Sequence, residues 1–302
     1  MGVPAWFLGH AAWKLLELVA EKAVSTWIPV APSAHWVARI NSCFRGRVDV
    51  LGQTAREPRL RIEGAHTLTD EQNQVAQTEK QCLLVENRPN DSHAILINEP
   101  LWLADPIECI AKTLDYAGVR ALRAEGFKPA ILSASAVIVC RETRELLLHM
   151  RGASVATFPN CLHTLGGAYI PGSPANVDPD RGGLRKTLIR EVNEETQLSL
   201  SDEIFPPMML CKEIDTGFVQ LVFLGFGVKK NMLLQLFGNW EGTPQVVSFD
   251  KLPDLLLQPH DWVPSGKAHI LAWLALGAPN AGRSPLFGTF SAGKLFDAAV
   301  GG

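Results

Sequence analysis

The chain has 302 residues, of which 47% are hydrophobic and 20% are charged, and its formal net charge is −3. This composition indicates a globular protein with enough apolar material for one large domain or two ordinary ones. The near-neutral charge excludes the strongly basic surface that is typical of nucleic-acid-binding domains, so we expect no nucleic-acid partner. The six cysteines are scattered without a C-x-x-C pair, which predicts buried free thiols in the reducing cytoplasm.

The N-terminal stretch 1–23 is apolar, but charged side chains interrupt it too often for a membrane-spanning helix. We therefore predict no stable membrane insertion, and a helix that docks on the protein's own core or on a partner subunit. This stretch opens a smaller N-terminal α/β domain, for which we predict residues 1–126. Within it the patterns predict strands at 59–62, 82–85 and 94–97, an exposed helix or loop at 70–81, and a helix at about 106–125.

Residues 127–302 are predicted to form the second domain, because the pattern of apolar and polar residues changes after Gly126. Alternating and continuous apolar runs predict strands at 134–140, 145–150, 208–211 and 218–228. A loop rich in Pro, Gly, Asn and Asp follows at 171–183. A helix is predicted at 265–274, with Ser265 as its cap.

The segment between that loop and the later strands carries clustered acidic residues. Read as a helix, residues 190–196 place Glu191, Glu194 and Glu195 on one arc of the surface with no lysine among them. Like charges spaced i,i+4 destabilise a helix by about 0.2–0.5 kcal/mol, so the cluster favours a bound cation. Clustered carboxylate oxygens are the ligands that suit Mg²⁺ or Mn²⁺, and a solvated acidic face is the alternative.

These residues resemble the signature of the Nudix hydrolases, G-x5-E-x7-R-E-U-x-E-E-x-G-U, in which U is aliphatic. Residues 190–196 match its helical half, and Leu198 takes the last aliphatic position. Gly166 and Gly167 match the paired glycines that open the signature, with Gly167 in the first position. The resemblance covers roughly residues 130–280 and implies an α/β/α sandwich with a mixed sheet.

The chain departs from the signature at three places. Ser173 stands where the family has its first glutamate, and Asp178 or Asp180 is a candidate to replace it. The stretch 174–189 is longer than the seven residues of the signature, so the box carries an insertion. Gln197 stands where a glycine normally ends the helix, which removes the residue that most easily adopts a left-handed conformation.

The resemblance implies an enzyme that hydrolyses a pyrophosphate bond with Mg²⁺ or Mn²⁺. Glu191, Glu194 and Glu195 would be the catalytic metal ligands, and Arg190 would brace Glu194 from the preceding turn. The expected substrate is a small-molecule diphosphate, namely a nucleoside diphosphate linked to a sugar or ribose, attacked by water. The N-terminal domain is expected to cover the nucleotide or to form a homodimer.

Further residues are candidates for the site outside the helix. Arg151 follows a strand and is a candidate for binding a substrate phosphate. Gly166 and Gly167 are candidates for binding the substrate as well. Glu213 and Asp215 are either a general base or solvated turn acids. His149 is interpreted as a core histidine of an apolar strand, and His163 either contacts a phosphate or fills the end of a strand. Trp240 either stacks on a base or packs beneath a loop.

Two other functions fit the same residues. One is a catalytically silent Nudix-fold module for binding or regulation, which Ser173, the insertion and Gln197 favour. The other is a Nudix enzyme that acts on a prenyl diphosphate, which would use a cysteine and an acid in the pocket. Cys161, close to the glycine pair, is the candidate cysteine.

Overall fold

The computed structural model describes residues 33–301 except 55, 99, 101–106, 172–182, 201–206, 208 and 284. The predicted helix in 1–23 therefore lies outside the described residues, and so do Ser173, Asp178 and Asp180. No helix in the described ranges is long and apolar enough to cross a membrane.

The described strands build one large mixed sheet and a small two-stranded one. Along its main path the large sheet runs β1-β9-β10-β5-β3-β4-β2, and β6, β7, β8 and β11 extend from β5 and β6. The strands are β1 (Val48–Gln53), β2 (Arg59–Ala65), β3 (Ser92–Leu96), β4 (Glu108–Asp115), β5 (Ile131–Cys140), β6 (Glu145–Arg151), β7 (Leu162–His163), β8 (Leu165–Ala168), β9 (Met209–Glu213), β10 (Phe218–Val228), β11 (Gly242–Ser248), β12 (Leu286–Phe287) and β13 (Phe290–Ser291). The helices are α2 (Ser33–Cys43), α3 (Asp70–Val85), α4 (Tyr116–Ala124), α5 (Leu184–Thr196), α6 (Lys230–Leu233), the 3-10 turn η1 (Phe249–Lys251), α7 (Leu252–Leu257), α8 (Pro264–Ala275) and α9 (Ala292–Gly301).

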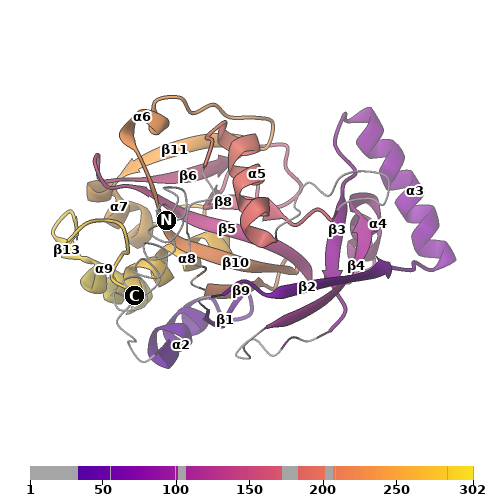
Figure 1. The fold of residues 1–302 in the computed structure, drawn as a ribbon, viewed down its shortest axis with the longest axis horizontal. Helices are drawn as coiled ribbons and strands as arrows, with labels where there is room; N and C mark the ends of the chain where they lie inside the picture. Colours follow the sequence, from indigo (N-terminus) through magenta and orange to yellow (C-terminus); the bar gives the residue numbers. More distant parts are fainter. Residues whose placement is uncertain are drawn as a thin grey trace, which may run out of the picture. The chain divides into compact units, whose positions relative to one another are not determined.

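Strand β5 is the centre of the large sheet. It pairs in parallel with β10 along its whole length and antiparallel with β3, β6 and β8. Every residue of β5 is buried, because α5 covers one face of the sheet and α8 covers the other (Figure 1). The mixed sheet between these helices confirms the predicted α/β/α sandwich.

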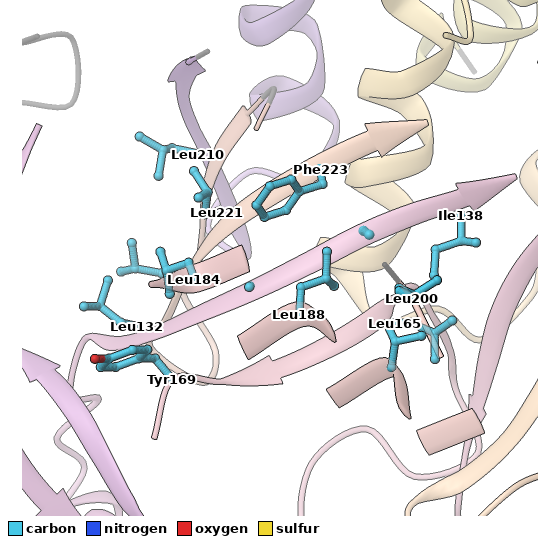
Figure 2. Packing of buried hydrophobic residues seen from close by; sticks show 14 of the residues in the cluster. Leu132, Ile138, Leu165, Tyr169, Leu184, Leu188, Leu200, Leu210, Leu221 and Phe223 are labelled. Atoms are coloured by element: carbon cyan, nitrogen blue, oxygen red, sulfur yellow. The ribbon is translucent and has the colours of Figure 1, made fainter. Parts of the chain in front are cut away.

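The side chains of β5 alternate between the two faces, as the period of a strand requires. Figure 2 shows the α5 side, where Leu184 and Leu188 pack over Leu132 of β5 and Phe223 of β10. On the other side, Ser135 bonds to Thr164, which in turn bonds to a histidine of α8. One face of β5 is thus apolar and the other meets a buried polar network.

Several predicted elements are confirmed. The hairpin predicted at 134–140 and 145–150 is formed by β5 and β6, and the run at 218–228 is β10. The helix predicted at 265–274 is α8. Its cap was predicted wrongly, because Val263 takes the N-cap position and Ser265 lies buried inside the first turn.

Two predictions for the N-terminal half are wrong. Residues 82–85 form the last turn of α3, whose N-cap Thr69 makes a full capping box with Gln72. The helix predicted at about 106–125 is instead β4 followed by α4. Asp115 caps α4 by accepting a hydrogen bond from the Gly118 N–H, so the helix begins only at Tyr116.

Strands β1 to β4 belong to the same sheet as the strands of the second half. β1 pairs with β9, and β3 pairs with β5 through Ile95 and Ile131. The predicted division into residues 1–126 and 127–302 stays a prediction. All six cysteines are free thiols; Cys109, Cys140 and Cys211 are buried as predicted, whereas Cys43 and Cys82 are exposed.

Candidate functional site

Helix α5 places the predicted carboxylates beside the sheet. Leu184, Leu188 and Val192 follow a spacing of four residues and are fully buried against the core. This packing fixes the rotation of α5 about its axis. The side chains of Glu191 and Glu195 therefore lie against the glycines of β8. Gln197 ends the helix in a left-handed conformation (φ 60°) and donates its N–H to Asn193 O. The helix end therefore keeps its shape without the glycine of the signature, at a cost of about 1–2 kcal/mol.

The glycine pair of β8 lies directly under this helix. The Gly166 N–H donates to Glu195 Oε2 at 3.2 Å. A Cβ atom on Gly167 would lie 2.3 Å from Cδ of Glu191, so only glycine leaves room for that carboxylate. The two glycines thus let α5 bring two carboxylates down onto the sheet.

Arg190 holds two of the glutamates in place. Its guanidinium donates to Glu194 Oε2 at 3.0 Å, to Glu191 Oε1 at 2.9 Å and to the carbonyl oxygen of Ala168 at 2.9 Å. The predicted brace between Arg190 and Glu194 is therefore present. Arg190 also bridges Glu191 and Glu194, which places an internal cation between them.

Burial changes the acidity of the carboxylates. It raises the pKa of Glu191 to about 8, against the opposing effect of Arg190. Burial, followed by the charges of Glu191 and Glu241, raises the pKa of Glu195 well above its usual range. His149 Nδ1 lies 3.4 Å from Glu195 Oε1, and burial lowers the pKa of this histidine to about 4. Burial thus favours the neutral forms of both partners, so we do not count this contact as an ion pair.

Seven of the residues that the sequence proposed for the site line one cavity of about 440 Å³. These residues come from β6, β8 and α5. They are Arg151, Gly166, Gly167, Arg190, Glu191, Glu194 and Glu195. Cys161, the cysteine considered for prenyl diphosphate chemistry, is not among the described residues that line it.

Comparisons with known proteins bear on the fold. No family model matches the chain, and no curated protein matches its sequence. A MutT/nudix family protein from Enterococcus faecalis aligns at 17% identity over 38% of this chain and 42% of that chain, with a TM-score of 0.30. A MutT NUDIX hydrolase from Burkholderia pseudomallei aligns at 19% identity over 45% of this chain and 94% of that chain, with a TM-score of 0.32. A bifunctional NMN adenylyltransferase/ADP ribose pyrophosphatase from Francisella tularensis aligns at 13% identity over 52% of this chain and 44% of that chain, with a TM-score of 0.35.

These identities and TM-scores are too low to carry information on substrate or activity. Within the chain itself, the glycine pair of β8 lies against the carboxylates of α5. The described residues form an α/β/α sandwich around a mixed sheet.

Two further carboxylates line the same cavity as helix α5. Glu241, in the turn before β11, is held by the bond from its N–H to Asn239 Oδ1, and Asn239 in turn donates to the carbonyl oxygen of Glu194. Burial raises the pKa of Glu241, and its charge acts on Glu191 and Glu195. The sequence predicted a role only for the neighbouring Trp240, because an isolated acid before a strand gives no signal.

Glu213 is buried at the end of β9, so its interpretation as a solvated turn acid is wrong. The hydroxyl of Ser265 donates to Glu213 Oε2 at 2.5 Å, whereas Glu213 Oε1 is buried without a hydrogen-bond partner. Burial raises the pKa of Glu213, and the hydroxyl groups of Ser265 and Thr216 oppose this effect, Ser265 most strongly. Asp215, the other candidate base, instead pairs with Arg47 at 3.1 Å and does not line the cavity.

A buried polar network surrounds Ser265 on the α8 side of the sheet. His163 Nε2 lies 3.3 Å from Ser265 Oγ, and Gln220 Nε2 donates to the same oxygen at 3.3 Å. His269 Nδ1 lies 2.8 Å from Thr164 Oγ1. His163 and Gln220 also line the cavity, so the network connects α8 with the site.

The charge of Arg151 affects the pKa values of several residues in the site. The guanidinium of Arg151 donates to Thr157. Burial lowers the pKa values of His149 and His163, and the charge of Arg151 lowers them further. The same charge opposes the rise that burial causes in the pKa values of Glu213 and Glu241. A guanidinium that shares a cavity with several carboxylates can also pair with a phosphate oxygen.

The donor set suits a divalent cation, although no cluster in the described ranges is already arranged around a common point. Oxygen atoms of Glu191, Glu194, Glu195 and Glu241 are the type of ligand that Mg²⁺ and Mn²⁺ prefer. Burying such carboxylates is costly unless a cation compensates their charge. Arg190 provides part of that compensation in the described conformation.

Proposed function

We propose that the protein is a Nudix-type hydrolase that cleaves the pyrophosphate bond of a nucleoside diphosphate linked to another group. The observation that carries the proposal is the crowding of Glu191, Glu194, Glu195 and Glu241 around one cavity. Two of these carboxylates have strongly raised pKa values because they are buried together. Such an arrangement is unfavourable for the apoprotein alone and favourable for a site that holds Mg²⁺ or Mn²⁺.

The four glutamates would hold the ion, with Arg190 and the Gly166 N–H keeping three of them in position. A bound divalent ion would offset charge on the diphosphate oxygens and lower the pKa of an attacking water. Arg151 lines the same cavity and would pair with a phosphate oxygen. The absence of a side chain on Gly167 leaves room for the Glu191 carboxylate at the cavity.

Glu213 is our candidate for the group that accepts a proton from the attacking water. It lines the cavity, and its Oε1 atom is buried without a partner. Ser265 fixes the other oxygen, so the free oxygen has a defined direction. Glu213 does not belong to the Nudix helix, which leaves the helical glutamates available for the metal.

The test is turnover with Mg²⁺ or Mn²⁺ on ADP-ribose, NADH, UDP-glucose, dinucleoside polyphosphates, coenzyme A and prenyl diphosphates. We expect hydrolysis of a nucleoside diphosphate derivative, and a loss of at least roughly tenfold in Glu194→Gln. Glu63→Gln is the matched control, because Glu63 is an exposed carboxylate outside the cavity. Turnover that is unchanged in Glu194→Gln would overturn the assignment of the site.

A second candidate is a catalytically silent module that binds the same class of ligand. The bridge from Arg190 to Glu191 and Glu194 favours it, because an internal cation already occupies the carboxylates. The same experiment separates the two functions. Ligand binding by calorimetry without turnover on any substrate would support the silent module.

A further inference from the structure

The cavity has a second set of lining residues outside the Nudix helix and the glycine pair. His93 comes from β3, Tyr116 and Arg123 come from α4, and Phe218 opens β10. Three of the four belong to the part of the chain that lies outside the resemblance to the Nudix signature. The N-terminal half of the chain therefore builds a part of the cavity wall.

Arg123 is a partly buried cation without a partner of opposite charge. Its Nη2 atom donates to the carbonyl oxygen of Thr216 at 2.6 Å, and its guanidinium carbon lies 5.8 Å from the centre of the Phe218 ring. Its Nε atom is buried without a hydrogen-bond partner. Arg123 forms no ion pair with any residue in the described ranges. Burial lowers the pKa of Arg123, which records the cost of keeping this charge away from water.

His93 adds a second unsatisfied group beside it. Its Nδ1 atom is buried without a partner, and its ring meets Tyr116 edge to face at 5.6 Å. Burial, followed by the charges of Arg123 and Arg190, lowers the pKa of His93 to about 4. The ring is therefore neutral at pH 7, and it lies in the field of two guanidinium groups.

Of the acidic groups near this end of the cavity, Asp91 lines it, and Asp115 and Glu213 are already engaged. Asp115 accepts hydrogen bonds from the Gly118 N–H and from Asn90, one on each oxygen. Glu213 is the carboxylate whose charge acts on Arg123, and Ser265 holds one of its oxygens. The nearby carboxylates thus leave the guanidinium of Arg123 unpaired.

We propose that Arg123 and His93 form an oxyanion subsite for the part of the substrate that lies beyond the diphosphate. The inference rests on the proposed function, because it assigns the far end of the same substrate. A guanidinium with unused donors binds a carboxylate or a phosphate monoester, whose charge offsets its desolvation. The substrate class is therefore a diphosphate that carries a second acidic group.

Pairs of ligands that differ by one acidic group test the subsite. For a carboxylate, UDP-glucose is compared with UDP-glucuronate. For a phosphate monoester, dephospho-coenzyme A is compared with coenzyme A, and NADH with NADPH. Binding is measured by calorimetry in EDTA and again with Ca²⁺, so that the result does not depend on turnover. In at least one pair the acidic member should bind roughly tenfold more tightly to the wild type.

Arg123→Gln should abolish this preference and leave the affinity for the other member of the pair unchanged. Arg120→Gln is the matched control on the same helix, because Arg120 pairs with Glu79 outside the cavity and should keep the preference. If Arg123→Gln does not fold, Arg123→Lys decides, since it keeps the charge and loses the planar fork, and it should weaken the preference.

The absence of any preference in the wild type, including the absence of binding, would overturn the subsite. A preference that persists in both Arg123 variants would also overturn it. Turnover with Mg²⁺ is measured separately, with Glu194→Gln as the test variant. Failure of the hydrolase proposal would appear as intact binding preference without hydrolysis, so the two failures can be distinguished.

Discussion

The glycine at position 167 and the carboxylate of Glu191 share one volume. A Cβ atom on Gly167 would lie 2.3 Å from Cδ of Glu191 and 2.4 Å from each of its oxygens. A strand residue and a helix residue that are distant in the sequence are therefore matched in size. The position of the Glu191 carboxylate depends on the absence of a side chain below it.

Gly167→Ala should impair the site more than the fold. The new methyl group meets the far end of a flexible side chain, so Glu191 can rotate away at a stability cost within about 0.5 kcal/mol. The displaced carboxylate can no longer face the cavity, and turnover should fall at least roughly tenfold. Hydrolysis assays together with thermal melts would check this, and an active variant with a normal melt would contradict it.

Gly166→Ala should show the opposite pattern. Gly166 has a φ of 142°, and its Cβ atom would lie 2.1 Å from the carbonyl oxygen of Ala134. Backbone cannot move aside as a side chain can, so we expect destabilisation of roughly 1–3 kcal/mol or more. Urea denaturation of the two glycine variants side by side would measure the difference. Equal stability of the two would show that the close approach to Ala134 is not rigid.

The elements with a strong period could be predicted from the sequence. The strand at 218–228 is nearly continuous in apolar residues because it is covered on both faces, and α5 carries a recognisable box. The run at 82–85 was wrongly predicted to be a strand, because Leu84 and Val85 are apolar and yet exposed at the end of α3. Local composition does not reveal that a helix leaves such residues in solvent.

The helix predicted at about 106–125 shows a different ambiguity. Ile107, Ala111 and Leu114 are buried, and their spacing of four and three residues fits a helix. In β4, Ala111 and Leu114 instead lie on opposite faces, and each is buried in a different cluster. The N-cap formed by Asp115 with Gly118 was the available signal for the later start of α4. Glu213 gave no such signal, because its burial depends on Ser265, a residue distant in sequence.

Ser265 should act on the pH dependence of hydrolysis through Glu213. Burial raises the pKa of Glu213, and the Ser265 hydroxyl lowers it by stabilising the charged form. Ser265→Ala removes this opposing effect, so the pKa of Glu213 should rise and a larger fraction should be protonated at a given pH. The acidic limb of the kcat/KM profile should therefore move to higher pH.

Ser133→Ala is the matched control for that experiment. Ser133 is also a buried serine, and it donates to the carbonyl oxygen of Val219 outside the cavity. Ser133→Ala loses one buried hydrogen bond, worth about 1 kcal/mol, whereas Ser265→Ala also loses the contacts of Gln220 and His163 with the same hydroxyl. The acidic limb should move only in Ser265→Ala. An unmoved limb in Ser265→Ala would remove Glu213 as the proton acceptor.

His269 should make the fold sensitive to acid. The residue is fully buried on α8, and burial lowers its pKa well below the usual value. The unfolded chain binds a proton at this position near pH 6.5 and the folded chain does not, so stability falls as the pH drops below about 6.5. The loss should approach about 1.4 kcal/mol per pH unit for this residue.

Buried glutamates with raised pKa values increase the stability of the fold as the pH falls. The contribution of His269 is therefore measured as the difference in stability between the wild type and a His269 variant. Denaturation of the wild type and His269→Gln at pH 7, 6 and 5 should show a smaller loss of stability in the variant. His35→Gln, at an exposed position, should retain the slope of the wild type. Parallel slopes for all three proteins would show that His269 titrates in the folded state.

The most direct test of the account is a titration with Mn²⁺ followed by electron paramagnetic resonance. It compares the wild type with Glu194→Gln and with the exposed control Glu63→Gln. The account predicts that the wild type and Glu63→Gln bind Mn²⁺ with the same affinity, and that Glu194→Gln binds it at least roughly tenfold more weakly. No binding by the wild type, or equal binding by all three proteins, would contradict a metal site on α5.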